Sequence, residues 1–387
     1  MSRPLSTWSD LIAHVLDYLG SNATQEAARD ARRATLDAYR ELSHAHRWSY
    51  YQSRGRIQTV AHYTTGTVAY DHTGGTYERM LTLTDGVWPS WAARGAVLVE
   101  QVVYLVAERK SDTVLTLNID SNPGLDIAAG TEYTIYQDTY VLKHDFLEME
   151  QIYEAKRTFW LEYGEPGEWM GLQTARLGPA SPRMYCIQGH PDYYGCMALF
   201  LWPPPDNIYY LDFVYQRRPR PLKLDQYSDG KVSTTSNSAT VTGDGTNWTS
   251  SLIGSVLRIS SSKLDLPTGP AGANPAAAER IITAVASTTS LTVDSVLTDT
   301  FSGVKHLISD PADIEEGAMF TALLRCCEAQ TTITRLMKNL PQAQASYRDA
   351  LILAREADSR SYARRGPGAK RAGYRRLANM PRGPDVS

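Results

Sequence analysis

The sequence has few cysteines and no long apolar run. Its four cysteines among 387 residues are too few for a disulfide scaffold. The four are Cys186, Cys196, Cys326 and Cys327. Their spacing lacks the Cys-x-x-Cys pairs of a zinc site. No apolar stretch approaches the roughly 20 residues of a membrane-spanning helix, and the N-terminus MSRPLSTWSD does not resemble an export signal. These absences favour a soluble, intracellularly made protein whose cysteines are small buried side chains.

Recognisable catalytic motifs are missing as well. The chain has no P-loop, no Gly-x-Ser-x-Gly and no His-Glu-x-x-His. His44 and His46 lie on different faces of an expected helix, so they are poorly placed to share a metal ion. Acidic pairs such as Glu148 and Glu150 could serve glycoside hydrolysis, which needs two carboxyl groups roughly 5 to 10 Å apart across a cleft. Nothing singles out one pair, so we predict no catalytic residue, no metal and no cofactor.

Charge is unevenly distributed along the chain. The net charge is −3, but the segment from Arg360 to the C-terminus holds eight basic residues against one acidic residue, which gives +7 there and −10 elsewhere. An acidic body is a poor non-specific binder of nucleic acid, because neutralising phosphates supplies most of that affinity. The basic tail is too polar to bury itself, and we expect it to become ordered only on a partner.

Two helices are predicted at the N-terminus. Residues 8–19 place apolar side chains on one face, Thr7 and Asp10 fit a capping box, and Gly20 stops the run. Residues 24–48 carry a stripe of small side chains at alternating spacings of three and four, which permits close helix approach. We assign this stripe to packing between subunits; its members are Ala27, Ala31, Ala34 and Ala38.

Further helices are predicted in the middle and at the end of the chain. The segment FLEMEQIYEAKRTFWLEYG, residues 146–164, reads as an amphipathic helix ended by Gly164. Asp310 and Pro311 read as the N-cap and first residue of another helix. Pro341 breaks or kinks that helix, and a last one follows to about Ser359.

Two β segments repeat one another. Residues 66–138 and 230–310 share four features in the same order: a Gly-x-Val start, an Asp-Gly pair with Gly-x-Val-Leu ten residues after the Asp, the block SDTVLTL or STTSLTV, and the closing segment YTIYQD or KHLISD. Four ordered matches favour a duplication. The second copy has an insertion at 260–279, whose composition predicts an exposed flexible loop. Between the two copies, PRMYCIQ, MALFLW and IYYLDFVYQ read as strands.

The predicted fold class is α+β: a helical bundle with two inserted, mutually similar small β modules, a β-hairpin or sheet segment and an extended C-terminal tail. The expected domains are 1–65, an N-terminal helix pair; 66–140, the first β module; 141–229, a bundle helix with three strands; 230–309, the second β module; 310–359, C-terminal helices; and 360–387, the basic tail.

The chain resembles the head-to-tail adaptor proteins of short-tailed and related bacteriophages. The resemblance rests on the order of HRWSYY after the N-terminal helices, DFLEMEQIYE, the hairpin LFLWPPPDNIYYLDFVYQ, GTNWTSSLIGSVLRI and a C-terminal helix. It implies a structural ring, a dodecamer, at the virion neck. The ring would sit below the portal protein and join the capsid to a downstream tail or nozzle protein, with tail fibres as further partners. DNA would pass through the channel without specific binding, and no membrane is involved.

A different class of function remains open from the sequence: a carbohydrate- or cell-wall-binding tail component with hydrolase activity. For the adaptor reading, the portal-docking element is the last helix together with the basic tail. Apolar anchors on the helix would enter a groove, and arginines would clamp carboxylates. The residues assigned to this role are Tyr347, Leu351, Ala354, Tyr362, Arg364, Arg365, Arg371, Tyr374, Arg375 and Arg376.

Overall fold

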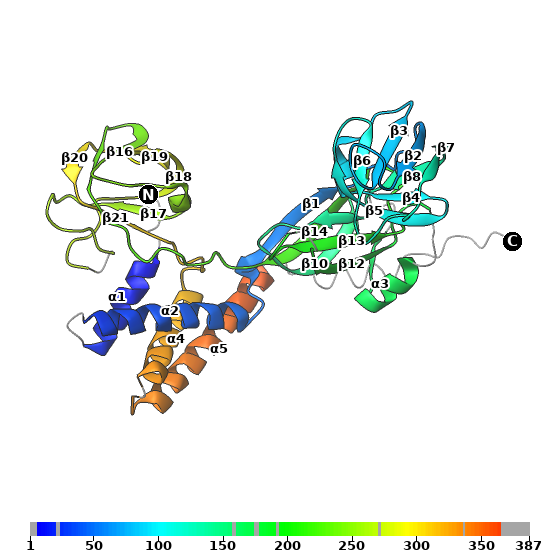
Figure 1. The fold of residues 1–387 in the computed structure, drawn as a ribbon. Coiled ribbons are helices and arrows are strands. Elements are labelled where there is room, and N and C mark those ends of the chain that lie inside the picture. Colours follow the sequence, from blue (N-terminus) through cyan, green and yellow to red (C-terminus); the bar gives the residue numbers. More distant parts are fainter. Residues whose placement is uncertain are drawn as a thin grey trace. The chain divides into compact units, whose positions relative to one another are not determined.

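Strands dominate the structure, a computed structural model that describes residues 6–20, 24–156, 160–173, 178–190, 193–269, 272–335 and 337–364. About 38% of the chain is strand and 25% is helix. Among the described residues, 21 strands form four sheets. The predicted helical bundle with small β inserts is therefore wrong, because the sheets are the larger part of the fold. The chain divides into two compact units, Met1–Tyr50 with Pro219–Ser387, and Tyr51–Arg218 (Figure 1).

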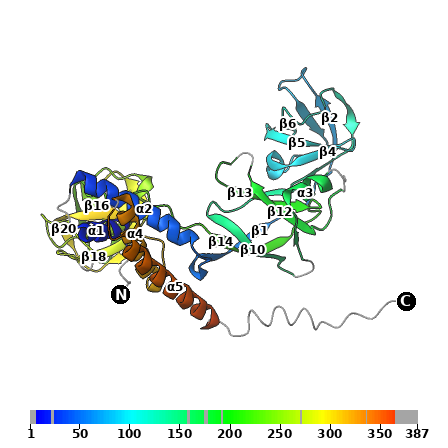
Figure 2. The ribbon, with the colours of Figure 1, turned by 90° about the horizontal axis from the view of Figure 1, so that it is seen from below.

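The described residues of the first unit contain four α-helices, and the predicted N-terminal pair is confirmed. The capping box of Thr7 and Asp10 starts the first helix, and Gly20 ends it in the left-handed conformation. These helices are α1 (Trp8–Leu19), α2 (Gln25–His44), α4 (Ala318–Thr334) and α5 (Leu340–Arg364). Helix α2 packs on α1 and α4, and α4 packs on α5 (Figure 2). Helix α4 begins after Gly317, so the predicted start at Asp310 is wrong.

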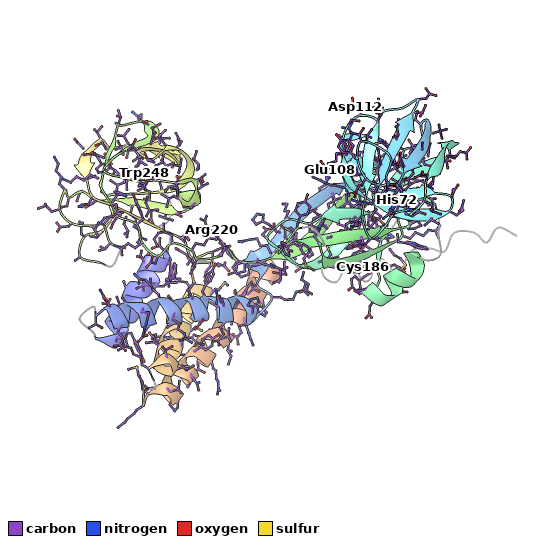
Figure 3. All side chains as sticks on the ribbon, in the orientation of Figure 1. His72, Glu108, Asp112, Cys186, Arg220 and Trp248 are labelled. Carbon is purple, nitrogen blue, oxygen red and sulfur yellow. The ribbon has the colours of Figure 1, made fainter. Side chains whose placement is uncertain are left out.

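The same unit holds a seven-stranded antiparallel sheet, which we call module 2. Its strands are β15 (Lys231–Thr234), β16 (Ser238–Asp244), β17 (Val256–Ile259), β18 (Ala278–Ser287), β19 (Ser290–Leu297), β20 (Phe301–Val304) and β21 (His306–Ser309). Their order is β20-β15-β16-β19-β18-β17-β21. The sheet curls into half of a barrel around an apolar core that contains Trp248 (Figure 3).

The second unit contains a sheet of the same design, which we call module 1. Its strands are β2 (Thr67–Asp71), β3 (Met80–Thr84), β4 (Ala96–Val99), β5 (Val102–Arg109), β6 (Val114–Leu117), β7 (Ile127–Thr131) and β8 (Tyr133–Tyr136). Their order, β7-β2-β3-β6-β5-β4-β8, is that of module 2 strand for strand. The repeat found in the sequence is thus a repeat of topology.

Equivalent residues also make the same hydrogen bonds in both modules. Tyr63 exchanges backbone hydrogen bonds with Ile135, and Tyr227 does so with Ile308. The Tyr63 hydroxyl accepts the amide of Val87, and the Tyr227 hydroxyl accepts that of Asn247. In each module the next residue is a buried tryptophan. These shared contacts identify equivalent residues in the two modules: Tyr63 with Tyr227, Ile135 with Ile308, and Val87 with Asn247.

In strands β4 and β17, the equivalence given by these contacts differs by one residue from the alignment of the two sequence repeats. Aligning the two Gly-x-Val-Leu blocks pairs Val97 with Val256. In the structure Val97 faces Ile135, whereas Leu257 faces the equivalent Ile308. Because side chains alternate between the faces of a strand, a shift of one residue exchanges core and surface. The cross-strand contacts therefore give the correct equivalence, Val97 with Leu257.

Two further sheets complete the second unit. One has the order β1-β14-β10 and the other β11-β12-β13-β9. Their strands are β1 (Gln52–Gln58), β9 (Thr139–Val141), β10 (Phe146–Glu154), β11 (Glu162–Tyr163), β12 (Met184–Gly189), β13 (Met197–Trp202) and β14 (Tyr210–Arg217), and a short helix, α3 (Pro166–Gln173), follows β11. The three strands predicted from PRMYCIQ, MALFLW and IYYLDFVYQ are confirmed as β12, β13 and β14.

The predicted helix at residues 146–164 is wrong, because this segment begins with the long strand β10. Two register shifts in its pairing with β14, after Phe146 and after Met149, break the usual alternation of faces. The buried side chains Phe146 and Ile152 and the half-buried Met149 therefore recur every three residues. This spacing imitates the periodicity of a helix.

Candidate protein-binding surfaces

The basic tail and its predicted docking residues lie largely outside the described residues. Tyr362 and Arg364 belong to the last turn of α5. The predicted docking residues that follow α5 lie outside the described residues: Arg365, Arg371, Tyr374, Arg375 and Arg376.

The predicted apolar anchors of α5 face their own unit. Tyr347 is 8% exposed and Ala354 is 2% exposed, while Leu351 is half-buried. Helix α5 packs on α4, so this face holds α5 in place rather than standing free. The opposite face of α5 presents Ile352 and Leu353, which are 54% and 63% exposed.

The alanine stripe of α2 is also inside the unit. All four members are completely buried, where α2 crosses α1 and α4: Ala27, Ala31, Ala34 and Ala38. Small side chains bring these helices close together, as the spacing indicated. The contacts of the stripe are made within one chain, so this face is not open to a neighbouring subunit.

A buried ion pair fastens α1 to the outer face of module 2. The guanidinium of Arg258, on β17, donates to both carboxylate oxygens of Asp10 at 2.6 and 2.7 Å. It also contacts Glu279 of β18 at 3.2 Å. The Arg258 side chain is only 2% exposed. Burial alone would lower the pKa of Arg258, but the hydrogen bond and charge of Asp10, followed by those of Glu279, raise it above the usual value.

Asp310 is a second fastening point of module 2. This buried carboxylate accepts the backbone amides of Lys223 and Leu224 at 2.7 and 2.8 Å. It also accepts the Ser255 hydroxyl at 2.7 Å and the Arg220 guanidinium at 3.3 Å. Arg220 lies below module 2 in Figure 3. The predicted N-cap residue instead anchors the segment that enters the module.

The insertion of module 2 is partly packed, which corrects the expectation of a fully exposed flexible loop. Leu264 is 84% exposed. Gly269, however, lies so close to the ion pair that a Cβ there would be 2.5 Å from Asp10. The end of the insertion, Glu279, belongs to β18 and contacts Arg258. The loop therefore helps to cover the buried ion pair.

Module 1 exposes apolar side chains on the equivalent face. Leu98 and Val103 pair across β4 and β5 at the positions that Arg258 and Glu279 occupy in module 2. Val103 is 38% exposed and the neighbouring Leu105 is 52% exposed. We call this surface the β4–β5 face. It replaces a buried charged contact by exposed apolar side chains.

Arg258 was not among the predicted site residues. One signal could have found it, because an arginine interrupts the apolar run VLRI, whereas the equivalent strand of module 1 reads AVLV. A charged side chain in a central strand with no polar neighbour in sequence requires a partner from elsewhere in the fold. That partner, Asp10, lies 248 residues away and could not be identified by spacing.

The acidic residues considered for hydrolysis have structural contacts. Glu150 accepts the side-chain amide of Gln216 at 2.8 Å and also that of Gln52. In the part of the chain that the structure describes, no group of His, Cys, Asp and Glu could hold a metal ion. Within the same residues, no helix has the length and apolar character needed to span a membrane.

Comparison with known proteins gives one match. Residues 108–238 match the family model of the SU10 adaptor protein. The chain is similar to SU10 adaptors over this segment. The match begins in β5 and ends at the first residue of β16, so it includes every strand of the two smaller sheets except β1, and it covers less than half of the chain. It points to a phage head-to-tail adaptor family, whose members are structural components of the virion. No curated protein and no solved structure matches the chain significantly.

Proposed function

We propose that the protein is a structural head-to-tail adaptor, which forms a ring below the portal protein and joins the capsid to the tail. The match of residues 108–238 to the SU10 adaptor protein carries this proposal. The partners are the portal protein on one side, a downstream tail or nozzle protein on the other, and tail fibres at the periphery. The ring is a dodecamer that encloses the channel through which DNA is ejected.

The charge distribution supports this role. Outside the tail the chain carries a net charge of −10. An acidic channel wall repels phosphates, so DNA can slide through it without being held. The same charge makes binding along DNA unfavourable at physiological salt.

Portal docking is assigned to the basic tail. Tyr347 and Ala354 hold α5 against α4, so the residues left for docking are those at and beyond the end of the helix. Arginines can form bidentate hydrogen bonds with carboxylates, and tyrosines supply contact area at interface centres. An acidic rim on the portal is the surface that this tail fits.

Removal of residues 365–387 tests the docking assignment. We expect the shortened chain to keep the circular-dichroism spectrum and thermal transition of the full chain, because α5 remains complete. Its binding to purified portal rings in sedimentation should be lost or at least about tenfold weaker, as expected when several charge-assisted hydrogen bonds disappear.

A matched control keeps the tail but replaces its arginines by lysines. Lysine retains the charge and loses the bidentate geometry, so we expect intermediate portal binding. Unchanged portal binding by the shortened chain, with loss only of a salt-dependent affinity for DNA, would contradict the assignment and identify the tail as a DNA-binding arm.

A further inference from the structure

The β4–β5 face of module 1 is the counterpart of a face that already seats a helix. In module 2, Val256 and Arg258 are buried, and the start of α1 lies against this side of the sheet through Asp10. The fastening continues along β21, because the amide of Trp8 donates to the carbonyl of Asp310 at 2.8 Å and that of Ser9 to the Ser309 hydroxyl at 3.1 Å. In one of the two modules, therefore, this face of the sheet binds a helix of the same chain.

In module 1 nothing within the hairpin covers the face. The connection between β4 and β5 is the two-residue turn Glu100–Gln101, both with positive φ, where module 2 has its long insertion. Next to Leu105, the turn at 118–121 adds Ile119, which is 68% exposed. Leu98, Val103 and Leu105 therefore lie together on one face of the sheet, with the exposed Ile119 in the adjoining turn, and such a group of apolar side chains is typical of a protein-binding site.

The face is continuous with an apolar contact inside the same unit. Ala96, which pairs with Leu105 across the sheet and with Tyr136 on its other side, is 3% exposed, and Tyr136 is 6% exposed. Exposure rises only at Leu98, Val103 and Leu105. The exposed side chains adjoin the buried Ala96 and Tyr136 on the same face of the sheet. A second protein surface placed against this face would bury them without changing the sheet.

A matching surface lies on α5. Ile352 and Leu353 are adjacent and exposed on the side away from α4, and a shallow hollow of about 420 Å³ adjoins Ile352. Arg355, Glu356 and Arg360 line the same hollow. An apolar centre with a polar rim is the usual composition of a protein interface.

We propose that the β4–β5 face of one copy receives the exposed face of α5 from a second copy. The inference rests on the proposed ring, because a closed ring needs two different surfaces of one chain that fit each other. Both surfaces are apolar, they lie in different units, and module 2 provides the precedent of a helix of this same chain on the equivalent face. In this contact Leu105 and Val103 pack against Ile352 and Leu353.

Cysteine cross-linking between differently substituted chains tests the contact. One preparation carries Leu105→Cys and the other Leu353→Cys, both with Cys196→Ser; the other native cysteines are buried. The two are mixed, with and without portal rings, and treated with a short bismaleimide. Only two different chains can yield the mixed product, so a link within one chain is not counted. We expect a covalent dimer, and none when Leu264→Cys replaces Leu105→Cys, since Leu264 is exposed but lies in module 2.

Charge variants give an independent measurement. Leu105→Glu should weaken association between copies about tenfold or more, because the contact would bury an unpaired carboxylate. Leu353→Lys as a single change should weaken association to a similar extent. In a mixture of the two variants, an ion pair between Glu and Lys at these positions should restore part of the lost association. Leu264→Glu is the control and should have no effect. All three positions are exposed, so the variants should fold.

Absence of the mixed cross-link, both at high protein concentration and on portal rings, overturns the contact, as does normal association of Leu105→Glu. These results differ from a failure of the proposed function. If wild-type protein builds rings on the portal and Leu105→Glu does so equally, the adaptor role stands and this contact is wrong. If the mixed cross-link forms but wild-type protein never binds portal, the contact stands and the adaptor role is wrong.

Discussion

Substitution of Asp10 by asparagine should detach α1 from module 2. The change leaves a side-chain oxygen that can still accept the amide of Thr7, which Asp10 now accepts at 2.9 Å, but it removes the charge opposite Arg258. Removing one partner of a buried ion pair costs about 3 to 5 kcal/mol. Glu279 remains at 3.2 Å, so we expect the lower end, about 3 kcal/mol or about a 100-fold change in the opening equilibrium.

Hydrogen exchange of the α1 amides measures this opening directly, because the two units need not unfold together. Asp17→Asn is the matched control on the same helix, and its effect should stay below about 0.5 kcal/mol. The double variant Asp10→Asn, Arg258→Met should recover part of the loss, because the buried guanidinium is removed while Glu279, which is 17% exposed, loses its ion pair. Equal exchange rates in the Asp10→Asn and Asp17→Asn variants would refute the reasoning.

Two further predictions concern the modules themselves. His306 is completely buried, and its burial, aided by Lys305, lowers its pKa to about 4. The unfolded chain therefore binds a proton that the folded chain does not between pH 6.5 and about 4, and the first unit should lose about 3 kcal/mol of stability over this range. Urea unfolding followed by tryptophan fluorescence at both pH values should show a smaller loss for His306→Phe; an equal loss would contradict the assignment. Gly66 of module 1 and Gly230 of module 2 occupy equivalent turns, with φ of 83° and 78°. A Cβ would lie 2.1 Å from a backbone oxygen at Gly66 and 2.4 Å from one at Gly230. Alanine at either position should destabilise its own unit by more than about 1 kcal/mol, with strain and clash as causes; thermal unfolding without a shift would show that the two turns are not equivalent.

Local patterns predicted much of the secondary structure. The capping box at Thr7, the stop at Gly20 and the period-two run of β14 depend on neighbouring residues, and all three appear as expected. The duplicated β segments were also visible, because both copies keep the same order of turns and strands. Their exact register was not, since it is set by contacts such as Tyr63 with Ile135, far apart in sequence.

The failures have specific physical causes. Two bulges gave β10 the spacing of a helix. Asp310 and Pro311 form a good helix start in sequence, but the Asp310 carboxylate is taken by Ser255, Arg220 and two backbone amides. The amphipathic face of α5 was correctly recognised as apolar, but its burial against α4 of the same chain could not be inferred from periodicity. Amphipathic patterns identify a buried face without identifying what covers it.

Electron microscopy of the purified protein mixed with portal rings is the decisive test of the adaptor role. We expect a closed ring of this chain on one face of the portal, coaxial with its channel, with every copy in the same environment. Particles in which the portal remains bare, or in which single copies bind the portal wall without closing a ring, would contradict the adaptor role.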